Sequence, residues 1–78
     1  MSFKKVRDAH QTENTEDYLE LIADLLNQHG EARIVDIASN LDITQATVNK
    51  TIKRLQIQGY IQKEPYRSIF LTVKGQQI

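Results

Sequence analysis

The chain has 78 residues, no cysteine, and ten acidic against ten basic residues. This length suits one domain with a small core, and the lack of cysteine excludes a disulfide scaffold and a thiolate metal site. No apolar run has the length of a membrane span, and the N-terminus lacks the apolar stretch of a signal peptide. We therefore expect a cytoplasmic protein without a membrane partner.

The neutral net charge hides an uneven distribution of charged residues. Residues 1–29 carry three basic and six acidic side chains, whereas residues 30–78 carry seven basic and four acidic ones. From Thr44 onward, six basic residues stand against one acidic residue. A locally basic segment of a neutral chain can still present a face that binds phosphate.

The first 29 residues predict an arm and a helix. Residues 1–13 are polar and charged without an apolar period, so we expect a flexible N-terminal arm, followed by a single domain over residues 14–78. A helix is predicted from about Thr15, a suitable N-cap, to about Gln28, and Gly30 is suited to end it. Its apolar stripe consists of Tyr18, Leu21, Ile22, Leu25 and Leu26.

Two further helices are predicted in the middle of the chain. The first covers residues 34–41, with Ala38 small enough for a close helix crossing, and residues 42–43 form the turn that follows. Thr44 caps the next helix, which runs from Gln45 to about residue 58. The buried face of that helix is formed by Val48, Ile52 and Leu55.

The C-terminal part changes from a helical to a strand period. Residues 60–63 and 68–71 are two short strand candidates, and Pro65, Tyr66 and Arg67 connect them in a hairpin. Thr72 can cap a short final helix. The expected fold class is mainly α with a small β-hairpin, a winged helix-turn-helix of three helices plus a wing.

A helix-turn-helix presents the outward face of its second helix to the major groove of DNA. Amide and ammonium groups can bond base edges, and a methyl group can meet a thymine methyl. Hydroxyl and basic groups near helix ends or at a wing tip suit phosphate or sugar. The candidate base readers are Gln45, Ala46, Asn49 and Lys50. The candidate backbone contacts are Arg33, Thr44, Thr47, Lys53, Tyr66 and Arg67.

Three alternatives to DNA binding remain open at this level. The outward side chains of the third helix can form an ordinary solvated face, or the winged helix can serve as a protein-interaction module. A metal sensor that acts without DNA is the third. An enzyme is not expected, because the sequence shows neither a nucleophile–base pattern nor a Gly-rich phosphate loop.

Asp17 and Glu20 share a helix face and have the oxygen ligands that hard divalent cations prefer. Two carboxylates do not complete a site, since a manganese-like ion takes about six ligands. Acidic residues near a helix start also have a simpler role, stabilising the helix dipole. His10 and His29 fall outside any ligand spacing and are expected at the surface.

The chain resembles a known family over nearly its whole length. The resemblance is to the N-terminal domain of the manganese-responsive repressors of the diphtheria-toxin-repressor family. It is carried by the segments EDYLELI (16–22), GEARIVDIA (30–38), TQATVNK (44–50), KRL (53–55), PYRSIFLT (65–72) and KG (74–75). The segment VRDAH (6–10) is similar to the N-terminal extension of long proteobacterial members.

The resemblance implies a homodimeric repressor in which bound Mn²⁺ fixes two DNA-binding domains on a palindromic operator in double-stranded DNA, with no RNA partner. It also implies that Asp17 and Glu20 match the first-helix metal ligands of the family. The remaining ligands and the dimerisation domain of the family lie beyond the winged helix and are absent from this chain. We therefore expect only a partial metal site here.

Overall fold

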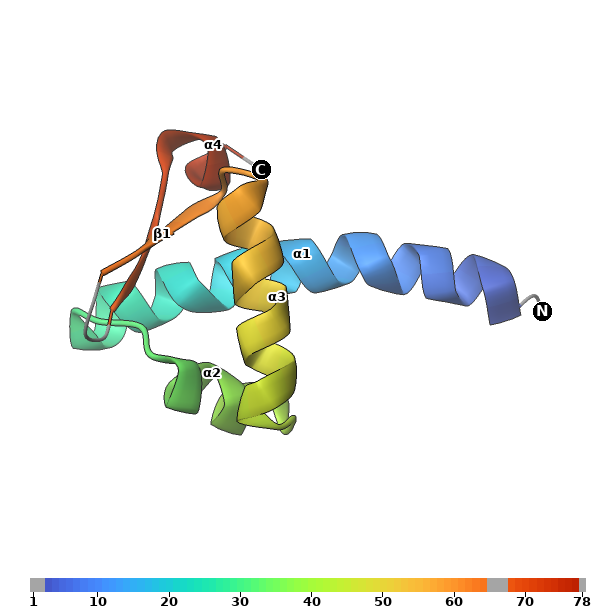
Figure 1. The fold of residues 1–78 in the computed structure, drawn as a ribbon, viewed down its shortest axis with the longest axis horizontal. Helices are drawn as coiled ribbons and strands as arrows, with labels where there is room; N and C mark the ends of the chain where they lie inside the picture. Colours follow the sequence, from blue (N-terminus) through green and yellow to red (C-terminus); the bar gives the residue numbers. More distant parts are fainter. Residues whose placement is uncertain (1–2, 65–67, 78) are drawn as a thin grey trace.

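The computed structural model describes residues 3–64 and 68–77, with side chains from Asn14 onward. Figure 1 shows a mainly helical chain with one two-stranded antiparallel hairpin, which confirms the predicted winged helix-turn-helix fold. The elements are α1 (Phe3–His29), α2 (Ile34–Leu41), α3 (Gln45–Ile57), β1 (Ile61–Lys63), β2 (Ile69–Leu71) and α4 (Val73–Gln76). Among the described residues, no helix has the length and apolar character needed to cross a membrane.

The start of α1 differs from the prediction. The helix begins at Phe3 rather than near Thr15, so residues 3–13 of the expected arm continue the helix. This stretch holds no glycine or proline, and six of its eleven residues are good helix formers: Lys4, Lys5, Arg7, Ala9, Gln11 and Glu13. Once the packed part of a helix exists, adding residues of this kind costs little. Thr15 consequently lies within the helix and does not cap it. Its hydroxyl accepts a hydrogen bond from Arg54 of α3 at 3.2 Å.

The turn between α2 and α3 has a defined local geometry. Asp42 adopts the left-handed conformation at φ 56°, and its N–H donates to the carbonyl oxygens of Ala38 and Ser39. Aspartate tolerates this conformation better than most residues because its short polar side chain can bond locally. Thr44 caps α3 as predicted, with its Oγ1 accepting from the N–H of Thr47 at 3.2 Å.

The hairpin is fixed to the helical part through the loop after α1. In the antiparallel register, Ile61 pairs with Leu71 and Lys63 pairs with Ile69. The N–H of Ile69 donates to the Ala32 carbonyl at 2.8 Å, and the Ala32 N–H donates to the buried Ser68 Oγ at 3.2 Å. The predicted connection of Pro65, Tyr66 and Arg67 lies outside the described residues.

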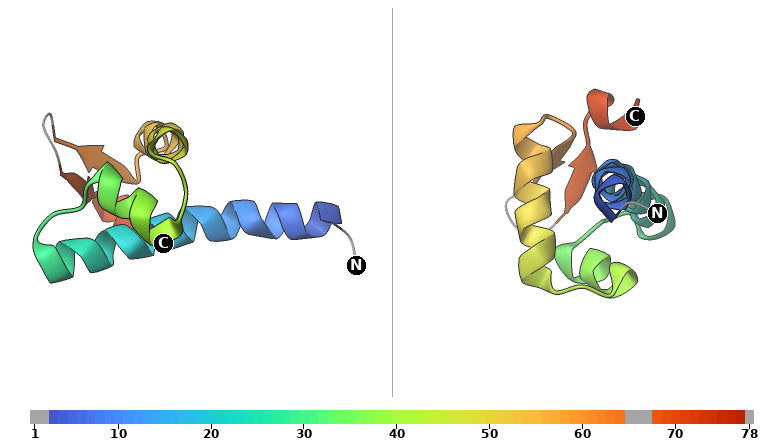
Figure 2. Two further views of the ribbon diagram at one scale, coloured as in Figure 1. Left: turned by 90° about the horizontal axis from the view of Figure 1, so that it is seen from below. Right: turned by 90° about the vertical axis from the view of Figure 1, so that its right-hand side faces the viewer.

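The core lies between α1 and the elements packed on it: viewed end-on, α1 has α2, α3 and the hairpin on one side and is open on the other (Figure 2). Leu19 is also buried, although the predicted stripe omitted it, whereas Leu21 and Leu26 are only partly buried. The reason is that β2 packs on α1 as well, so α1 is covered over a wider arc than one stripe. The buried apolar residues are Tyr18, Leu19, Ile22, Leu25, Ala32, Ile37, Ala38, Val48, Ile52, Leu55, Ile61 and Ile69.

The short helix α4 is held against the end of α3. The Thr72 hydroxyl accepts from the Gly75 N–H at 3.1 Å and donates to the Gly59 carbonyl at 2.6 Å. Lys74 Nζ donates to the Gln58 carbonyl at 2.8 Å and lies 4.7 Å from the centroid of the Tyr60 ring. We call these contacts of Thr72, Lys74 and Gly75 the α3–α4 junction.

Replacing Gly75 by alanine should destabilise the fold. The added Cβ would collide with the backbone carbonyl oxygen of Tyr60 and lie 3.5 Å from a methyl carbon of Leu71. Overpacking of this kind costs about 1–3 kcal/mol, measurable as a lower free energy of unfolding in a urea titration. Gln76→Ala, at an exposed neighbouring position, is the control. Equal stability of Gly75→Ala and the unchanged chain would contradict the close approach.

Replacing Tyr18 by phenylalanine should leave stability unchanged or raise it. The Tyr18 side chain is 1% exposed, and its hydroxyl has no hydrogen-bond partner among the described residues. Removing a buried unpaired polar group relieves a desolvation cost of about 1–3 kcal/mol. Tyr18→Ala should instead lose about 3–5 kcal/mol, as deletion of a core aromatic does. A loss in Tyr18→Phe close to that in Tyr18→Ala would mean that the hydroxyl has a partner.

Candidate nucleic-acid interface

The outward face of α3 carries every base reader that the sequence predicts. Gln45, Ala46, Asn49 and Lys50 are exposed. The opposite face is fully buried through Val48, Ile52 and Leu55. Because an α-helix has 3.6 residues per turn, burial of that stripe fixes which side chains project outward.

The N-terminus of α3 is arranged to accept an anion. The Oγ1 atoms of Thr44 and Thr47 share a hydrogen bond at 2.9 Å, and both residues are exposed. The first N–H groups of a helix have no partner within it, and the helix dipole is positive at this end. A phosphate placed here would meet backbone donors and threonine hydroxyls together.

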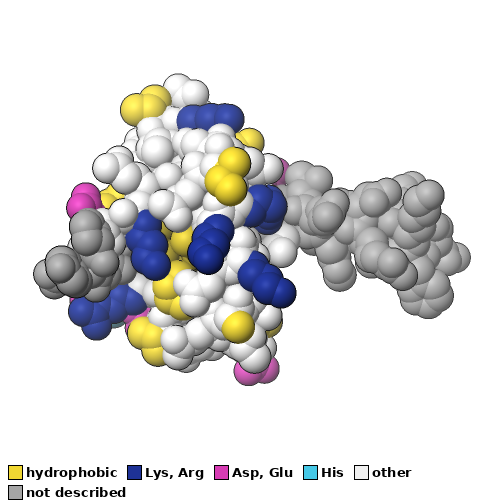
Figure 3. All heavy atoms as spheres, viewed as in Figure 1, with side chains coloured by type: hydrophobic (Ala, Val, Ile, Leu, Met, Phe, Trp, Pro, Cys, Tyr) yellow, Lys and Arg dark blue, Asp and Glu magenta, His cyan; other side chains and the backbone are white. Residues whose placement is uncertain are grey.

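Basic side chains surround this helix on one face of the molecule. Figure 3 shows lysine and arginine side chains gathered over and beside α3, with aspartate and glutamate at the margins of the face. Lys50, Lys53 and Arg54 are exposed on α3, which itself holds no acidic residue. Exposed Lys63 of β1 and Arg33, the N-cap residue of α2, extend the charge beyond α3. We call these five residues the basic face.

Two members of the basic face already have polar partners. Arg33 Nε lies 3.5 Å from a Glu31 carboxylate oxygen, and both side chains are exposed, so the pair is weak and can give way to a phosphate. Arg54 donates to Thr15 Oγ1 and to Gln58 Oε1, each at 3.2 Å, which ties α3 to α1. Lys50, Lys53 and Lys63 form no ion pair within the part of the chain that the structure describes.

The structure adds two residues that the sequence analysis left out, and it does not describe two that the sequence analysis included. Arg54 and Lys63 were not predicted, although Arg54 follows Lys50 by one helical turn and Lys63 precedes the wing connection. Both signals were present in the sequence. Tyr66 and Arg67, predicted at the wing tip, lie outside the described residues.

Asp17 and Glu20 are exposed on α1, as their spacing predicted. No group of three or more histidine, cysteine, aspartate or glutamate side chains lies close enough to hold a metal ion among the residues with a described placement. His29, at the end of the same helix, is not brought into such a group. Two exposed carboxylates alone do not provide the ligands that a divalent cation needs.

Comparison with known proteins identifies the family of this chain. Residues 10–69 match the family model described as "Iron dependent repressor, N-terminal DNA binding domain". The chain is 47% identical over 76 residues to "Transcriptional regulator MntR" of Escherichia coli O6:H1, covering 97% of this chain and 49% of the relative. It is 49% identical to the protein of the same name in Salmonella typhimurium strain LT2, covering 97% of this chain and 48% of the relative.

The chain also matches more distant proteins at lower sequence identity. "HTH-type transcriptional regulator MntR" of Shouchella clausii is 40% identical over 67 residues, which is 86% of this chain and 47% of the relative. The crystal structure of the hypothetical protein SSo2273 from Sulfolobus solfataricus superposes with a TM-score of 0.75 at 27% identity, covering 83% of this chain and 50% of that one. The chain spans about half the length of the curated relatives that it matches. It belongs to the iron-dependent repressor family of DNA-binding transcription regulators.

Proposed function

We propose that this chain is the DNA-binding part of a manganese-responsive repressor that acts in the cytoplasm as a homodimer on a palindromic operator. The observation that carries the proposal is the exposed outer face of α3, with polar base readers flanked by the basic face. A two-fold dimer places two such helices on two half-sites, which is why a palindrome is the matching DNA sequence.

In this proposal α3 enters the major groove, whose width admits one α-helix. The amides of Gln45 and Asn49 have the donor and acceptor pattern that pairs with adenine, and the ammonium of Lys50 suits guanine. Ala46 offers a methyl group to thymine. These four side chains are exposed in the absence of DNA, so no refolding of the helix is needed to use them.

Phosphate contacts hold the helix in register but do not select a sequence. Thr44 and Thr47 would bind one phosphate at the N-terminus of α3, and Lys53 a second along the groove edge. Arg33 would exchange its exposed Glu31 partner for phosphate. Tyr66 and Arg67 keep their predicted roles at the wing tip, and Arg54 and Lys63 add to the phosphate-binding charge.

The manganese response rests on Asp17 and Glu20 as hard oxygen ligands on α1. These two residues do not form a complete site by themselves, since no third ligand accompanies them in the described part of the chain. The further ligands of the family come from beyond the winged helix. DNA binding by this chain is therefore proposed to need no metal.

The proposal is tested by fluorescence anisotropy of the chain titrated onto a labelled palindromic operator candidate and onto random duplex, over a salt series. Tighter binding to the operator with a steep loss of affinity in salt supports a sequence-specific DNA reader. Absence of binding to either duplex at low salt would favour the protein-interaction module.

Alanine at Lys53 and alanine at Asn49 should weaken DNA binding in different ways. Lys53→Ala should reduce affinity for operator and random duplex alike and lower the salt slope by about one unit. Asn49→Ala should cost about 1–3 kcal/mol at its own base pair and leave random duplex unaffected. Anisotropy on both duplexes measures both effects. The same loss pattern for the two variants would contradict the division between phosphate and base contacts.

Manganese should change the stability of this chain little. With Asp17 and Glu20 alone, binding is too weak to stabilise the folded state, because stabilisation requires a metal concentration well above the dissociation constant. Thermal unfolding followed by circular dichroism, with and without MnCl₂, measures the shift in Tm, and Asp17→Asn/Glu20→Gln is the control. A large upward shift that disappears in the control would mean that this chain completes the site itself.

A further inference from the structure

Arg54 joins α3 to α1 through a side-chain contact. Its Nη1 atom donates to Thr15 Oγ1 of α1 and to Oε1 of Gln58, the C-cap residue of α3, each at 3.2 Å. Arg54 and Gln58 are four residues apart and so share one side of the helix. The planar guanidinium is rigid, so it loses little further freedom when it makes the second bond. One nitrogen atom thus holds an acceptor on each of two elements.

The apolar contacts of α3 leave its direction relative to α1 only partly fixed. The helix packs mainly on α2 and β1. Its buried stripe fixes its rotation, but apolar burial is non-directional and tolerates a small swing of the helix axis. A hydrogen bond instead has a preferred length and angle. Arg54 lies about 100° around the helix axis from buried Leu55, so its bond to Thr15 restrains α3 from the side.

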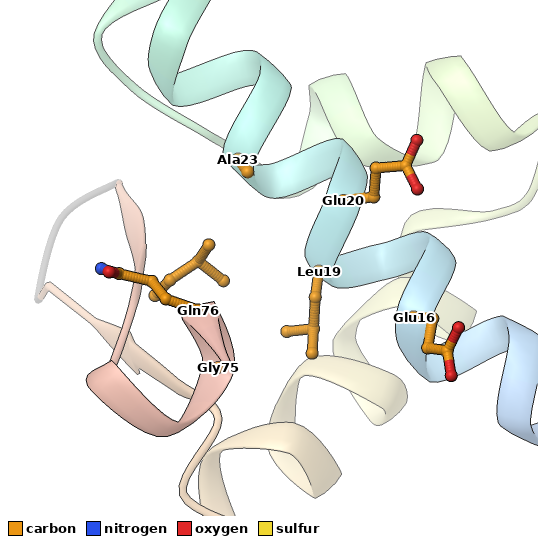
Figure 4. Close-up of a pocket in the computed structure, with 7 residues that line it drawn as sticks. Glu16, Leu19, Glu20, Ala23, Gly75 and Gln76 are labelled. Atoms are coloured by element: carbon orange, nitrogen blue, oxygen red, sulfur yellow. The ribbon is translucent and has the colours of Figure 1, made fainter. Parts of the chain in front are cut away.

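The partner of Arg54 on α1 is a neutral hydroxyl, although carboxylates follow it along the helix. Glu16 and Glu20 border the groove between α1 and α4, and their carboxylates project from α1 away from α4 (Figure 4). Arg54 forms no ion pair with an acidic residue in the described part of the chain. A neutral acceptor orients the guanidinium without cancelling its charge. Arg54 therefore still contributes to the positive potential of the basic face.

We propose that Arg54 is a positioning residue for base recognition: through Thr15 it fixes the direction of α3, and this sets the preference for the operator over random DNA. Hydrogen bonds to base edges require a narrow range of distance and angle, so a small swing of α3 weakens them. Attraction to phosphate falls slowly with distance and survives the same swing. Lys50 lies one helical turn from Arg54, so a displacement there reaches the base readers.

The inference rests on the proposed function for the entry of α3 into the major groove. The effect of the bond on the direction of α3 is independent of DNA. Two measurements, one without DNA and one with it, therefore separate the failure of this inference from the failure of the proposed function.

The main variant is Thr15→Val, which removes the hydroxyl, keeps the β-branched shape and leaves every charge in place. Thr15→Ser retains the acceptor and should behave as the unchanged chain does. Thr51→Val is the matched control, because it makes the same change at another half-buried threonine, which takes no part in the contacts of Arg54. Circular dichroism and urea titration establish that each variant folds and give its stability.

The measurement without DNA uses residual dipolar couplings of the backbone N–H groups, which report the directions of α1 and α3 in one frame. In the unchanged chain, in Thr15→Ser and in Thr51→Val, one alignment tensor should fit both helices of the structure. In Thr15→Val, α3 should require a different or a smaller tensor than α1, as a reoriented or more mobile helix does. One shared tensor in Thr15→Val would overturn the proposal, whatever the affinity of that variant for DNA.

The measurement with DNA is fluorescence anisotropy on the operator candidate and on random duplex over a salt series. Thr15→Val should lose about three- to tenfold in operator affinity, which corresponds to the net free energy of one hydrogen bond. Its affinity for random duplex and its salt slope should stay unchanged, because no charge is removed. In an Arg54→Met background, Thr15→Val should add no further loss of operator preference, because both changes break the same bond.

Three results on DNA would overturn the proposal. The first is a loss of stability in Thr15→Val with an unchanged ratio of operator to random affinity, because the bond would then be structural only. The second is additive loss of operator preference in Thr15→Val/Arg54→Met. The third is weaker binding in Arg54→Met alone, equal on both duplexes and with a lower salt slope, which would make Arg54 a phosphate contact.

Absence of DNA binding by the unchanged chain would count against the proposed function. If Thr15→Val still altered the couplings of α3, the positioning of α3 by Arg54 would remain supported.

Discussion

Burial of Val48, Ile52 and Leu55 is the constraint on which the rest of the structure depends. These three side chains are at most 1% exposed, and they fix α3 in rotation about its own axis. The composition of the outer face follows from that rotation, because the residues on the opposite side of the helix must then project into solvent. A polar substitution in the buried stripe would therefore disturb both the core and the orientation of the proposed DNA-binding face.

The elements with strong local signals could be predicted from the sequence. Thr44 and Thr72 cap α3 and α4 as expected, and α2 has the predicted bounds, because caps and apolar periods act within a few residues. The start of α1 could not be predicted in the same way. The absence of an apolar period in residues 3–13 predicted an arm, but the helix continues there. No glycine or proline separates this stretch from the packed part of the helix. Leu19 was missed because β2, which is distant in sequence, covers that side of α1.

The candidate site was partly predictable for a different reason. Its residues are exposed, so packing places no requirement on them, and only residue type and helical phase identify them. Those two criteria select Gln45, Asn49 and Lys50 correctly as outward-facing. They cannot show that Arg54 bonds to Thr15, since that contact depends on tertiary geometry. Nor can they show that Arg33 pairs with Glu31, since that contact depends on the local conformation of the loop after α1. Among the residues whose side chains are described, the lack of a third ligand near Asp17 and Glu20 is likewise a property of the fold.

The α3–α4 junction has a mechanical consequence. Thr72, Lys74 and the close approach of Gly75 to the Tyr60 backbone connect α4 directly to residues 58–60, which follow α3, through hydrogen bonds and packing. A domain attached to α4 would thus be connected to α3 rigidly. In the proposed DNA-binding mode, a tilt of α4 would rotate α3 and so change the angle at which α3 enters the major groove.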